Sequence, residues 1–408
     1  MGDSEYAAGE PEVENSVEDG FERVPIAAIL RGLAFAAIAV GMVGGLHYYI
    51  ASRFIEGMHL AGTAASAAWA GAGALFLSIP LSFFVRGLLP RPAAAVLRMT
   101  VYLWMGLFAL LITAVAAADV GAALVALARG EPVAQRWSPG LVALVLGACV
   151  PAMAWGLRSA LGPATIEQVQ VPISGLRPGL EGLRIVQISD LHIGETLHAA
   201  WARRVADEVN RLDPDVVAIT GDVADGSALK LGHEVMPLGG IRAKLGVFFV
   251  TGNHEYYNGA PEWEELMRGI GVTVLHNEHR VLSRGGDSLV VAGVTDSEGG
   301  RFSPTDAPRP DLAFAGAPEG TPRILLAHQP RAAFKAAPFR VDLQLSGHTH
   351  GGQIFPWMLF VRLQQPVLRG LKQVGGVRVY THRGTGFWGP PLRVGARSEI
   401  ACLTLTRA

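Results

Sequence analysis

The chain has 408 residues; half of them are hydrophobic, 17% are charged, and the formal net charge is −1. This near-neutral charge, without a long basic run, gives no support for a nucleic-acid-binding protein, so no nucleic-acid partner is expected. The two cysteines, Cys149 and Cys402, lie far apart in apolar sequence, which predicts buried thiols and no disulfide framework.

Residues 1–24 are acidic and contain few apolar side chains. Such a segment buries too little apolar surface to offset the entropy lost on ordering, which predicts a disordered acidic tail. Negative charge before the first apolar stretch is the wrong sign for a secretory signal peptide.

Residues 25–160 contain four long stretches without Asp, Glu, Lys or Arg, at about 32–52, 57–85, 99–118 and 137–157. Each reaches the roughly 20 residues that a helix needs to cross a bilayer. Buried helices of a soluble domain are the alternative, but soluble helices of this length seldom lack a charged face. We therefore expect an all-α region of four transmembrane helices in contact with membrane lipids, with a loop and a short helix between Asp119 and Arg136.

Basic residues flank the expected helix ends unevenly. Four crossings put the N-terminus, the loop between the second and third stretches, and everything after Leu157 on one side of the membrane. That side carries Arg23, Arg31, Arg86, Arg91, Arg98 and Arg158, and the opposite side carries Arg53, Arg129 and Arg136. The positive-inside rule then predicts an integral membrane protein whose C-terminal half is cytoplasmic.

From about residue 163, short apolar runs alternate with amphipathic stretches. Runs rich in Val, Ile, Leu and Phe at 183–188, 216–219, 247–250, 324–327 and 341–345 predict buried strands. Between the first two, residues 197–212 place apolar side chains at helical spacing. The order strand, helix, strand predicts an α/β domain with a largely parallel sheet over residues 165–408.

Residues able to bind metal or move protons follow every one of these strands. In chain order they are Asp190, His192, Asp222, Asn253, His254, Glu255, His328, His348 and His350. In open α/β sheets, ligands bind beyond the carboxyl ends of the strands, so these loops are expected to converge on one crevice. Each residue alone has a plainer interpretation as a turn, a cap or an ordinary histidine.

Asp, Asn and His together supply oxygen and nitrogen donors that suit Mn²⁺, Fe or Zn²⁺ better than Ca²⁺. The candidates outnumber the three or four protein ligands that one ion takes, which predicts two divalent metal ions, with manganese favoured and iron or zinc as alternatives. Two cations a few ångströms apart can hold a hydroxide and the oxygens of an in-line phosphoryl displacement.

These motifs resemble the calcineurin-like metallophosphoesterases, whose pattern Asp-x-His, Gly-Asp, Gly-Asn-His-Asp/Glu, His, Gly-His-x-His is present in order between residues 183 and 405. The resemblance implies a four-layer αββα sandwich with a dinuclear metal centre. By their positions in the motifs, Asp190, His192 and His350 would bind the first metal. Asn253, His328 and His348 would bind the second metal, and Asp222 would bridge both.

The same resemblance implies catalytic roles for two residues that bind no metal. His254 would stabilise the transition state and protonate the departing oxygen, and Glu255 would orient His254. Asp225 is either a further orienting residue or a turn residue.

Within the family, Asp-Leu-His-Ile-Gly at 190–194, Gly-His-Thr-His-Gly-Gly-Gln-Ile at 347–354 and the ending from Arg383 to Ile400 resemble a membrane-associated bacterial branch. That branch includes phosphodiesterases and is similar to UDP-2,3-diacylglucosamine pyrophosphatases, which implies a bacterial inner or cell membrane. The four-helix region matches no motif of that branch.

Two further features bear on the substrate. The apolar segment 354–361, followed by Arg362, Arg369 and Lys372, could receive an acyl chain and a phosphate or lie in the membrane interface. The alternative is packing in the core or against the membrane helices. Arg383 and Arg393 are candidates to bind substrate phosphate, with structural ion pairs as the alternative.

The sequence therefore predicts a membrane-bound, dinuclear-metal phosphoesterase that hydrolyses phosphodiester or pyrophosphate bonds by in-line attack of a metal hydroxide. A lipid-linked or nucleotide-linked phosphate ester such as UDP-diacylglucosamine is the expected substrate. The alternatives are a phosphomonoesterase or protein phosphatase, a non-catalytic membrane scaffold with the same fold, and a transporter or channel with a regulatory phosphoesterase domain.

Overall fold

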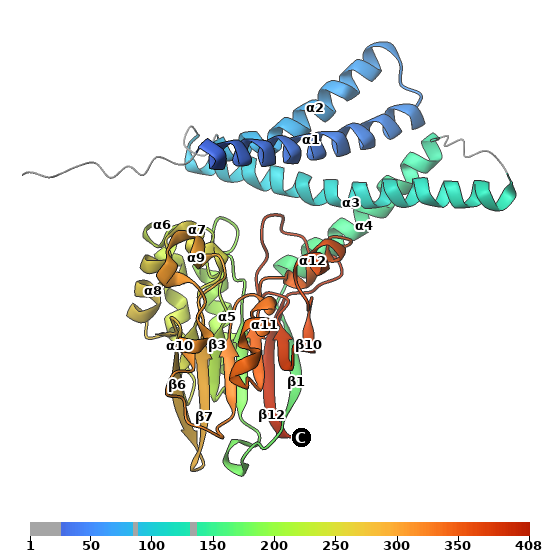
Figure 1. Cartoon of the computed structure of the whole chain (residues 1–408). Helices are drawn as coiled ribbons and strands as arrows, with labels where there is room; N and C mark the ends of the chain where they lie inside the picture. Colours follow the sequence, from blue (N-terminus) through green and yellow to red (C-terminus); the bar gives the residue numbers. More distant parts are fainter. Residues whose placement is uncertain (1–25, 85–88, 131–136) are drawn as a thin grey trace, which may run out of the picture.

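The computed structural model describes residues 26–84, 89–130 and 137–408. Four N-terminal helices lie across one end of an α/β domain (Figure 1). They are α1 (Ile26–Gly57), α2 (Gly62–Phe84), α3 (Arg91–Arg129) and α4 (Pro139–Leu161). The expected acidic tail lies outside the described residues, as do Arg23, Arg86 and Arg136 of the orientation argument.

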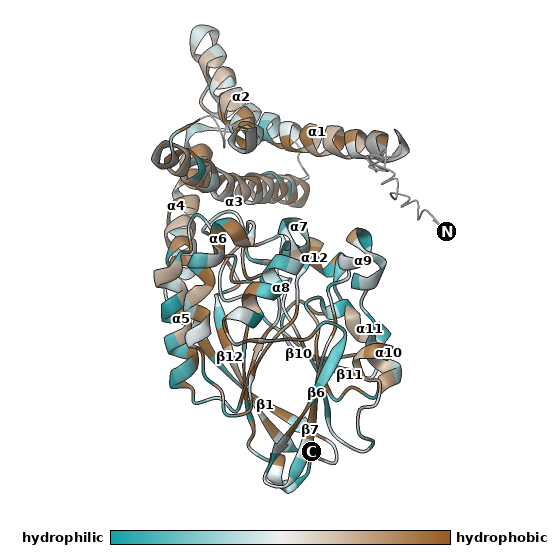
Figure 2. Cartoon of the chain, turned by 90° about the vertical axis from the view of Figure 1, so that its left-hand side faces the viewer, coloured by the Kyte–Doolittle hydropathy of each residue, from teal (hydrophilic) through white to brown (hydrophobic). Residues whose placement is uncertain are grey.

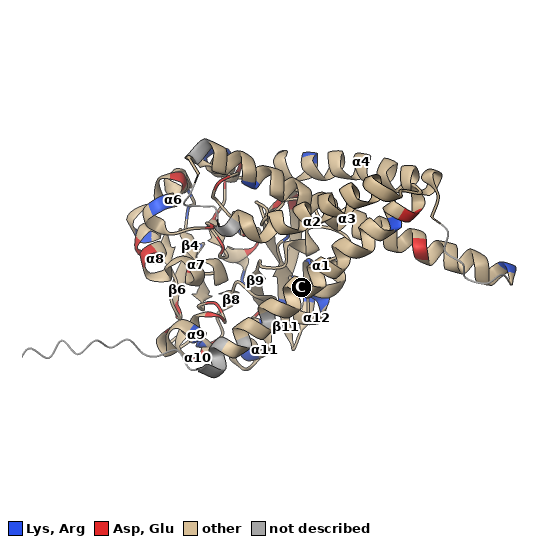
Figure 3. Cartoon of the chain, turned by 90° about the horizontal axis from the view of Figure 1, so that it is seen from above, with Lys and Arg blue, Asp and Glu red and all other residues tan. Residues whose placement is uncertain are grey.

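The four apolar helices expected from the sequence are confirmed, and each is long and apolar enough to cross a membrane. Viewed from above, most of the ribbon coloured for charged residues belongs to the α/β domain (Figure 3). Along the chain, α1 and α3 run across the end of that domain and beyond its edge, and α2 and α4 run in the reverse direction (Figure 1). This up-and-down order places the start of α1 and the end of α4 at the same end of the helical region.

A loop with a short helix was expected between Asp119 and Arg136. This prediction is wrong as far as Arg129, because α3 continues to Arg129 and is capped by Gly130. Val, Ala and Leu dominate this stretch and favour helix or are readily tolerated in one. Asp119 does not end the helix, since its carboxylate accepts hydrogen bonds from Tyr49 Oη at 2.6 Å and Trp137 Nε1 at 2.8 Å. Arg53 Nε donates to the same carboxylate at 3.0 Å.

The described part of the α/β domain contains two six-stranded mixed sheets. Their orders are β1-β12-β2-β3-β4-β5 and β10-β11-β9-β8-β7-β6. The strands are β1 (Thr165–Ile173), β2 (Arg184–Ile188), β3 (Val216–Ile219), β4 (Val247–Phe249), β5 (Thr273–Val274), β6 (Glu278–Arg284), β7 (Asp287–Gly293), β8 (Arg323–Leu326), β9 (Leu343–Ser346), β10 (Gly370–Val374), β11 (Val377–Thr381) and β12 (Glu399–Arg407). The five strands expected from apolar runs correspond to β2, β3, β4, β8 and β9, which pair in parallel within each sheet.

The two sheets pack face to face, with helices on both outer faces. Ile185 of β2 and Leu326 of β8 lie in the core between the sheets. The first sheet is covered by α5 (Ala199–Arg211), α6 (Ala228–Val235) and α8 (Ala260–Gly269), and the second by α10 (Pro310–Ala313) and α11 (Ala333–Ala336). Figure 2 shows apolar strands inside and mixed polar colouring on the covering helices. The αββα sandwich is therefore confirmed.

Helix α4 joins the helical region directly to the α/β domain. The Gly156 carbonyl accepts a hydrogen bond from the Arg393 backbone N–H at 3.0 Å, and Leu392 packs into the helical core beside Phe108. A Cβ atom on Gly156 would lie 2.5 Å from Leu392 Cδ1, so glycine is needed for this close approach.

We expect Gly156→Leu to lower the melting temperature by several degrees, because overpacking a close contact costs about 1–3 kcal/mol. Gly147→Leu is the matched control on the same helix, since a Cβ at Gly147 would meet nothing within 4 Å. Thermal unfolding of both variants in detergent tests the contact. Equal melting temperatures would show that α4 and the α/β domain are not packed as described.

Candidate metal centre

The residues that follow the strands meet at one end of the two sheets, on the side that faces α1 and α3 (Figures 1 and 2). Ligand atoms of Asp190, His192 and His350 lie within 4.8 Å of one another, and those of Asp222, His328 and His348 form a second such group. Asn253 opens α7 (Asn253–Asn258), and its Oδ1 lies 3.0 Å from His348 Nδ1. The structure thus brings together all seven predicted metal ligands.

Unusual backbone geometry aims these side chains over the strand ends. Positive φ angles occur at Asp190 (52°), His192 (46°), Asp222 (55°), His348 (71°) and His350 (50°). Asp and His tolerate this left-handed region better than most residues, and a cluster of such residues marks a functional site. Close approach also requires glycine, since a Cβ on Gly252 would lie 2.2 Å from Asp222 Oδ1.

Hydrogen bonds at the far side of two imidazoles turn their other nitrogens towards the centre. His328 Nδ1 donates to the Thr220 carbonyl at 2.7 Å, so His328 Nε2 faces the site. This Nε2 lies 3.2 Å from Asn253 Oδ1 and 3.2 Å from Asp222 Oδ2. Burial opposes protonation of His328, but the Asp222 carboxylate raises its pKa well above the usual value. Positive charge is therefore favoured among these three groups, which fits a metal ion in place of the proton.

In the first group, His192 Nδ1 donates to Asp225 Oδ1 at 2.7 Å, which turns His192 Nε2 towards His350 Nε2 at 3.0 Å. Arg393 donates to His350 Nδ1 at 3.2 Å, so neutral His350 carries its proton on Nε2 and donates it to His192. Burial lowers the pKa of His348 to about 3 and also lowers the pKa of His350 well below its usual value. Both imidazoles are therefore neutral, which is the form that binds metal.

His254 lies beside both ligand groups at the open edge of the site. Its Nδ1 is 2.8 Å from Asp225 Oδ1, and its backbone N–H donates to Asp222 Oδ1 at 2.9 Å. Burial opposes protonation, but the carboxylates of Asp222 and Asp225 raise the pKa of His254 to about 9. A protonated imidazole at this position can donate a proton to a substrate.

The orienting role of Glu255 stays a prediction, and the structure directs its carboxylate at backbone groups. Its buried carboxylate accepts hydrogen bonds from the backbone N–H groups of Asp222 at 2.9 Å, Val223 at 2.7 Å and Gly252 at 2.6 Å. Glu255 lies in the first turn of α7 and points back at the loop after β3, so it holds the Asp222 backbone in place. Asp225, for which two interpretations were open, is the residue that orients His254 and His192.

Comparison with known proteins decides the family. Residues 183–352 match the model of the calcineurin-like phosphoesterases. An uncharacterized metallophosphoesterase of Bacillus subtilis is 33% identical over 275 residues, which cover 64% of this chain and 93% of the relative. The chain belongs to the calcineurin-like metallophosphoesterase family. Members of this family use divalent metal ions, and this chain has candidate ligand groups for them.

Animal proteins are also similar to this metallophosphoesterase. A zebrafish protein named as a transmembrane protein with a metallophosphoesterase domain is 39% identical over 262 residues, covering 62% of this chain and 60% of the relative. A bovine protein of the same name is 40% identical over 264 residues and is also covered over 60% of its length. The chain thus spans less than two thirds of these relatives. Together with the four apolar helices, they support a membrane protein.

The structure does not bring Arg383 and Arg393 to the open face of the metallophosphoesterase site. Arg383 forms ion pairs with Glu399 and Glu167. Arg393 is fully buried, and its guanidinium donates to the carbonyls of Gly386 and Ala396, among others. These contacts favour the structural alternative to phosphate binding for both arginines.

Sequence reasoning missed several residues beside the centre. The rings of Trp388 and Tyr257 lie 5.9 Å and 5.6 Å from that of His254. A cavity of about 370 Å³ next to His328 is lined in part by Asp296 and Arg331. Asp296 closely follows the carboxyl end of β7, so recognising β7 as a strand would have identified it by the same rule as the metal ligands.

We expect Asp225→Ala to lower the rate of phosphoester hydrolysis by about 10- to 100-fold, the usual effect of losing a residue that orients a metal ligand. Asp225→Asn is the matched variant, because an amide oxygen still accepts from His192 and His254. Steady-state kinetics and metal content of both variants test this role. Partial recovery in Asp225→Asn is expected, whereas equal, wild-type rates in both would contradict it.

Proposed function

We propose that this chain is a membrane-bound hydrolase of phosphodiester or pyrophosphate bonds with a two-metal centre. The observation that carries the proposal is the pair of ligand groups whose imidazole nitrogens and carboxylate oxygens lie within 4.8 Å of one another, with His254 held beside them by Asp225. A binding protein that only kept the fold would have no chemical need for this combination.

The ligand groups correspond to the two metal sites that the motifs imply. Asp190, His192 and His350 would hold one cation, and Asn253, His328 and His348 the other, with Asp222 between them. Their nitrogen and oxygen donors suit manganese, with iron or zinc as alternatives. Bound divalent cations would supply positive charge for the phosphoryl oxygens and lower the pKa of a bound water.

The chain's own residues would handle the departing oxygen. The carboxylates of Asp222 and Asp225 favour the protonated form of His254, whose Nδ1 faces Asp225 and whose Nε2–H is then available to a substrate. Proton donation by such a group contributes typically 10²–10⁴-fold to a rate. The rings of Trp388 and Tyr257 flank His254 and could stack against a base or another flat group next to the scissile bond.

Exposed apolar side chains beside the centre favour a lipid-linked substrate. Helix α12 (Met358–Gln364) follows the last metal motif, and Phe355, Leu359, Phe360 and Leu363 are 48–83% exposed. Apolar surface of this kind next to a site fits an acyl chain or a membrane interface. A lipid-linked phosphate such as UDP-diacylglucosamine is therefore the proposed substrate, and another nucleotide-linked phosphate is the alternative.

We also propose that the α/β domain lies in the cytoplasm, beneath a bacterial inner or cell membrane, as the sequence motifs and the flanking basic residues favour. Arg31 is near the start of α1, Arg91 and Arg98 are near the start of α3, and Arg158 is near the end of α4, whereas Arg53 and Arg129 are near the ends of α1 and α3. With four crossings, the first set lies on the side of the α/β domain and the second set on the opposite side. This distribution follows the positive-inside rule. Arg98 also forms an ion pair with Glu195 of the α/β domain, which keeps this helix end at the domain.

Hydrolysis assays on the full chain in detergent with Mn²⁺ test the proposal. The substrates are bis-p-nitrophenyl phosphate, UDP-diacylglucosamine and the monoester p-nitrophenyl phosphate. We expect the diester and the lipid pyrophosphate to be cleaved faster than the monoester. A preference for the monoester would favour a phosphomonoesterase, and metal binding without any turnover would favour the scaffold. Substrate or metal flux into vesicles would favour a transporter.

A further inference from the structure

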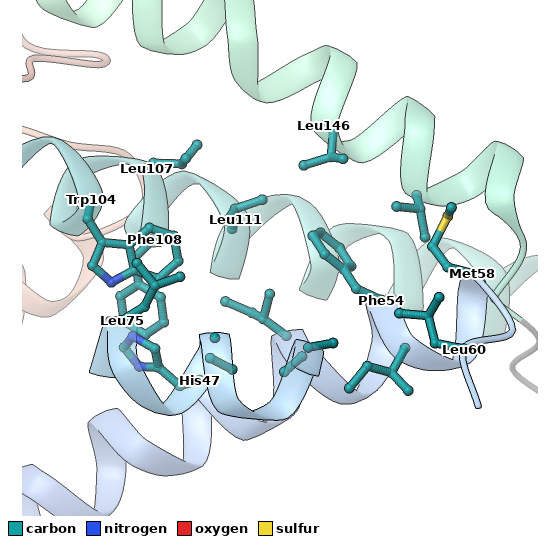
Figure 4. Close-up of a pocket in the computed structure, with 17 residues that line it drawn as sticks. His47, Phe54, Met58, Leu60, Leu75, Trp104, Leu107, Phe108, Leu111 and Leu146 are labelled. Carbon is teal, nitrogen blue, oxygen red and sulfur yellow. The ribbon is translucent and has the colours of Figure 1, made fainter. Parts of the chain in front are cut away.

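A cavity of about 530 Å³ lies among the four N-terminal helices (Figure 4). Its volume is within the roughly 300–1,000 Å³ of pockets that hold small organic ligands. Each helix contributes apolar side chains, among them Phe54 of α1, Leu75 of α2, Leu111 of α3 and Leu146 of α4. The described lining residues include no Asp, Glu, Lys or Arg, so the cavity suits an uncharged occupant.

Small residues on α2 leave this space open. Ala68, Gly71 and Ala72 lie on one face of α2 and line the cavity. A Cβ atom on Gly71 would meet nothing within 4 Å. Small residues in membrane helices usually let neighbouring helices approach closely. Here the neighbouring helices leave a gap instead, which is the arrangement of a binding cavity.

Within the part of the chain that the structure describes, two polar atoms at one end of the cavity have no hydrogen-bond partner. His47 is 5% exposed, and its Nδ1 donates to the Val43 carbonyl at 2.8 Å, so Nε2 is a bare acceptor. Trp104 Nε1–H is a donor, and the two rings lie 5.7 Å apart. Both Nε2 of His47 and Nε1 of Trp104 are buried without a partner, and Figure 4 shows the two rings at the same end of the cavity.

An acceptor and a donor side by side match one hydroxyl group, which can donate to His47 and accept from Trp104. Leaving both atoms unpaired in apolar surroundings is unfavourable, so an occupant with a hydroxyl is preferred over a plain hydrocarbon. This requirement separates the cavity from an ordinary gap filled by lipid tails.

The dimensions fit an aliphatic chain. The α1 residues that line the cavity run from His47 to Ile55, about 12 Å of helix, which is less than half of the ~30 Å hydrocarbon thickness of a bilayer. Met58 and Leu75 line the cavity and are 46% and 40% exposed, so the cavity opens to the surroundings of the helices. Because these helices are apolar enough to cross a membrane, those surroundings are lipid.

We propose that this cavity binds an uncharged membrane lipid with one aliphatic chain and a hydroxyl group that hydrogen-bonds His47 and Trp104. None of the lining residues belongs to the metal centre, so this site is separate from the hydrolytic one.

Photolabelling of the full chain in detergent with a hexadecanol that carries a diazirine on its chain tests this proposal. We expect label on cavity residues of the wild type. Gly71→Leu should abolish the label by filling the cavity, whereas Gly73→Leu, two residues along α2 and outside the lining, should leave it unchanged. His47→Phe keeps a ring to pack on Phe108, whose centroid is 3.9 Å away, and should weaken binding roughly fivefold.

Phosphoester hydrolysis by each variant checks that the protein is folded, and labelling gives the answer independently of the proposed activity. If His47→Phe does not fold, Trp104→Phe tests the same hydroxyl. Equal labelling by hexadecanol and by its methyl ether, which cannot donate to His47, would overturn the hydroxyl contact. Labelling that survives Gly71→Leu, or a crosslink from the cavity to a second copy of the chain, would overturn the lipid site.

Discussion

Replacing Asp222 by asparagine is expected to lower hydrolysis by more than about 100-fold, because losing even an orienting residue behind a metal ligand costs 10- to 100-fold. The amide oxygen can still accept from the His254 backbone N–H, so the loop should keep its shape. The negative charge that faces His328 and lies between the two ligand groups is lost. We therefore expect the metal content to fall together with the rate.

Asp213→Asn is the matched control for this experiment. Asp213 is also an aspartate in the α/β domain, but it is exposed and pairs with Arg184 and Lys244 at the surface. Its variant should keep the wild-type rate and metal content. An Asp222→Asn protein with full metal content and full activity would show that Asp222 does not lie between two bound cations.

Replacing His254 by glutamine is expected to lower the rate by about 10²–10⁴-fold, the usual contribution of a positioned proton donor. Metal content should not change, since His254 is a proton donor rather than a ligand in this account. The loss should be smaller for a p-nitrophenyl ester, whose leaving group needs little protonation, than for an alkyl ester.

Kinetics with both esters, together with metal analysis, distinguishes a proton donor from a ligand. An equal loss on both esters, accompanied by the loss of a metal ion, would identify His254 as a ligand of the centre. The three-residue group of His192, Asp225 and His254 makes that outcome a real competitor, since their ligand atoms also lie within 4.8 Å of one another.

The strands that the sequence predicted are mostly those that are buried on both faces. β2, β3, β8 and β9 are buried on both faces and read as continuous apolar runs, and the rule that ligands lie beyond the carboxyl ends of such strands identified the metal centre. β6 has a mixed pattern of exposed and half-buried residues, so no apolar run marked it. Missing β7, a strand of the second sheet, also hid Asp296.

Other features depend on contacts between residues far apart in the chain. Asp119 was interpreted as a helix end because a charge inside a membrane helix is unfavourable, but its partners Tyr49 and Trp137 cannot be identified from sequence. Likewise, the sequence places Glu255 next to His254, but only the structure shows that its carboxylate turns towards three backbone N–H groups. The position of a residue in the sequence therefore did not reveal the hydrogen-bond partners of Asp119 and Glu255.

The helical region shows the same limit. Length and composition predicted four apolar helices, and the described residues contain them. The nitrogens of His47 and Trp104 are buried next to each other only because α1 and α3 pack together. No sequence pattern therefore predicted the cavity.

The metal content of the full chain purified in detergent, measured after equilibration with Mn²⁺ and removal of free ions, tests the central claim most directly. The account predicts two metal ions per chain, and fewer in Asp222→Asn. A wild-type protein that binds no metal, or binds only one ion with full hydrolytic activity, would contradict the two-metal centre.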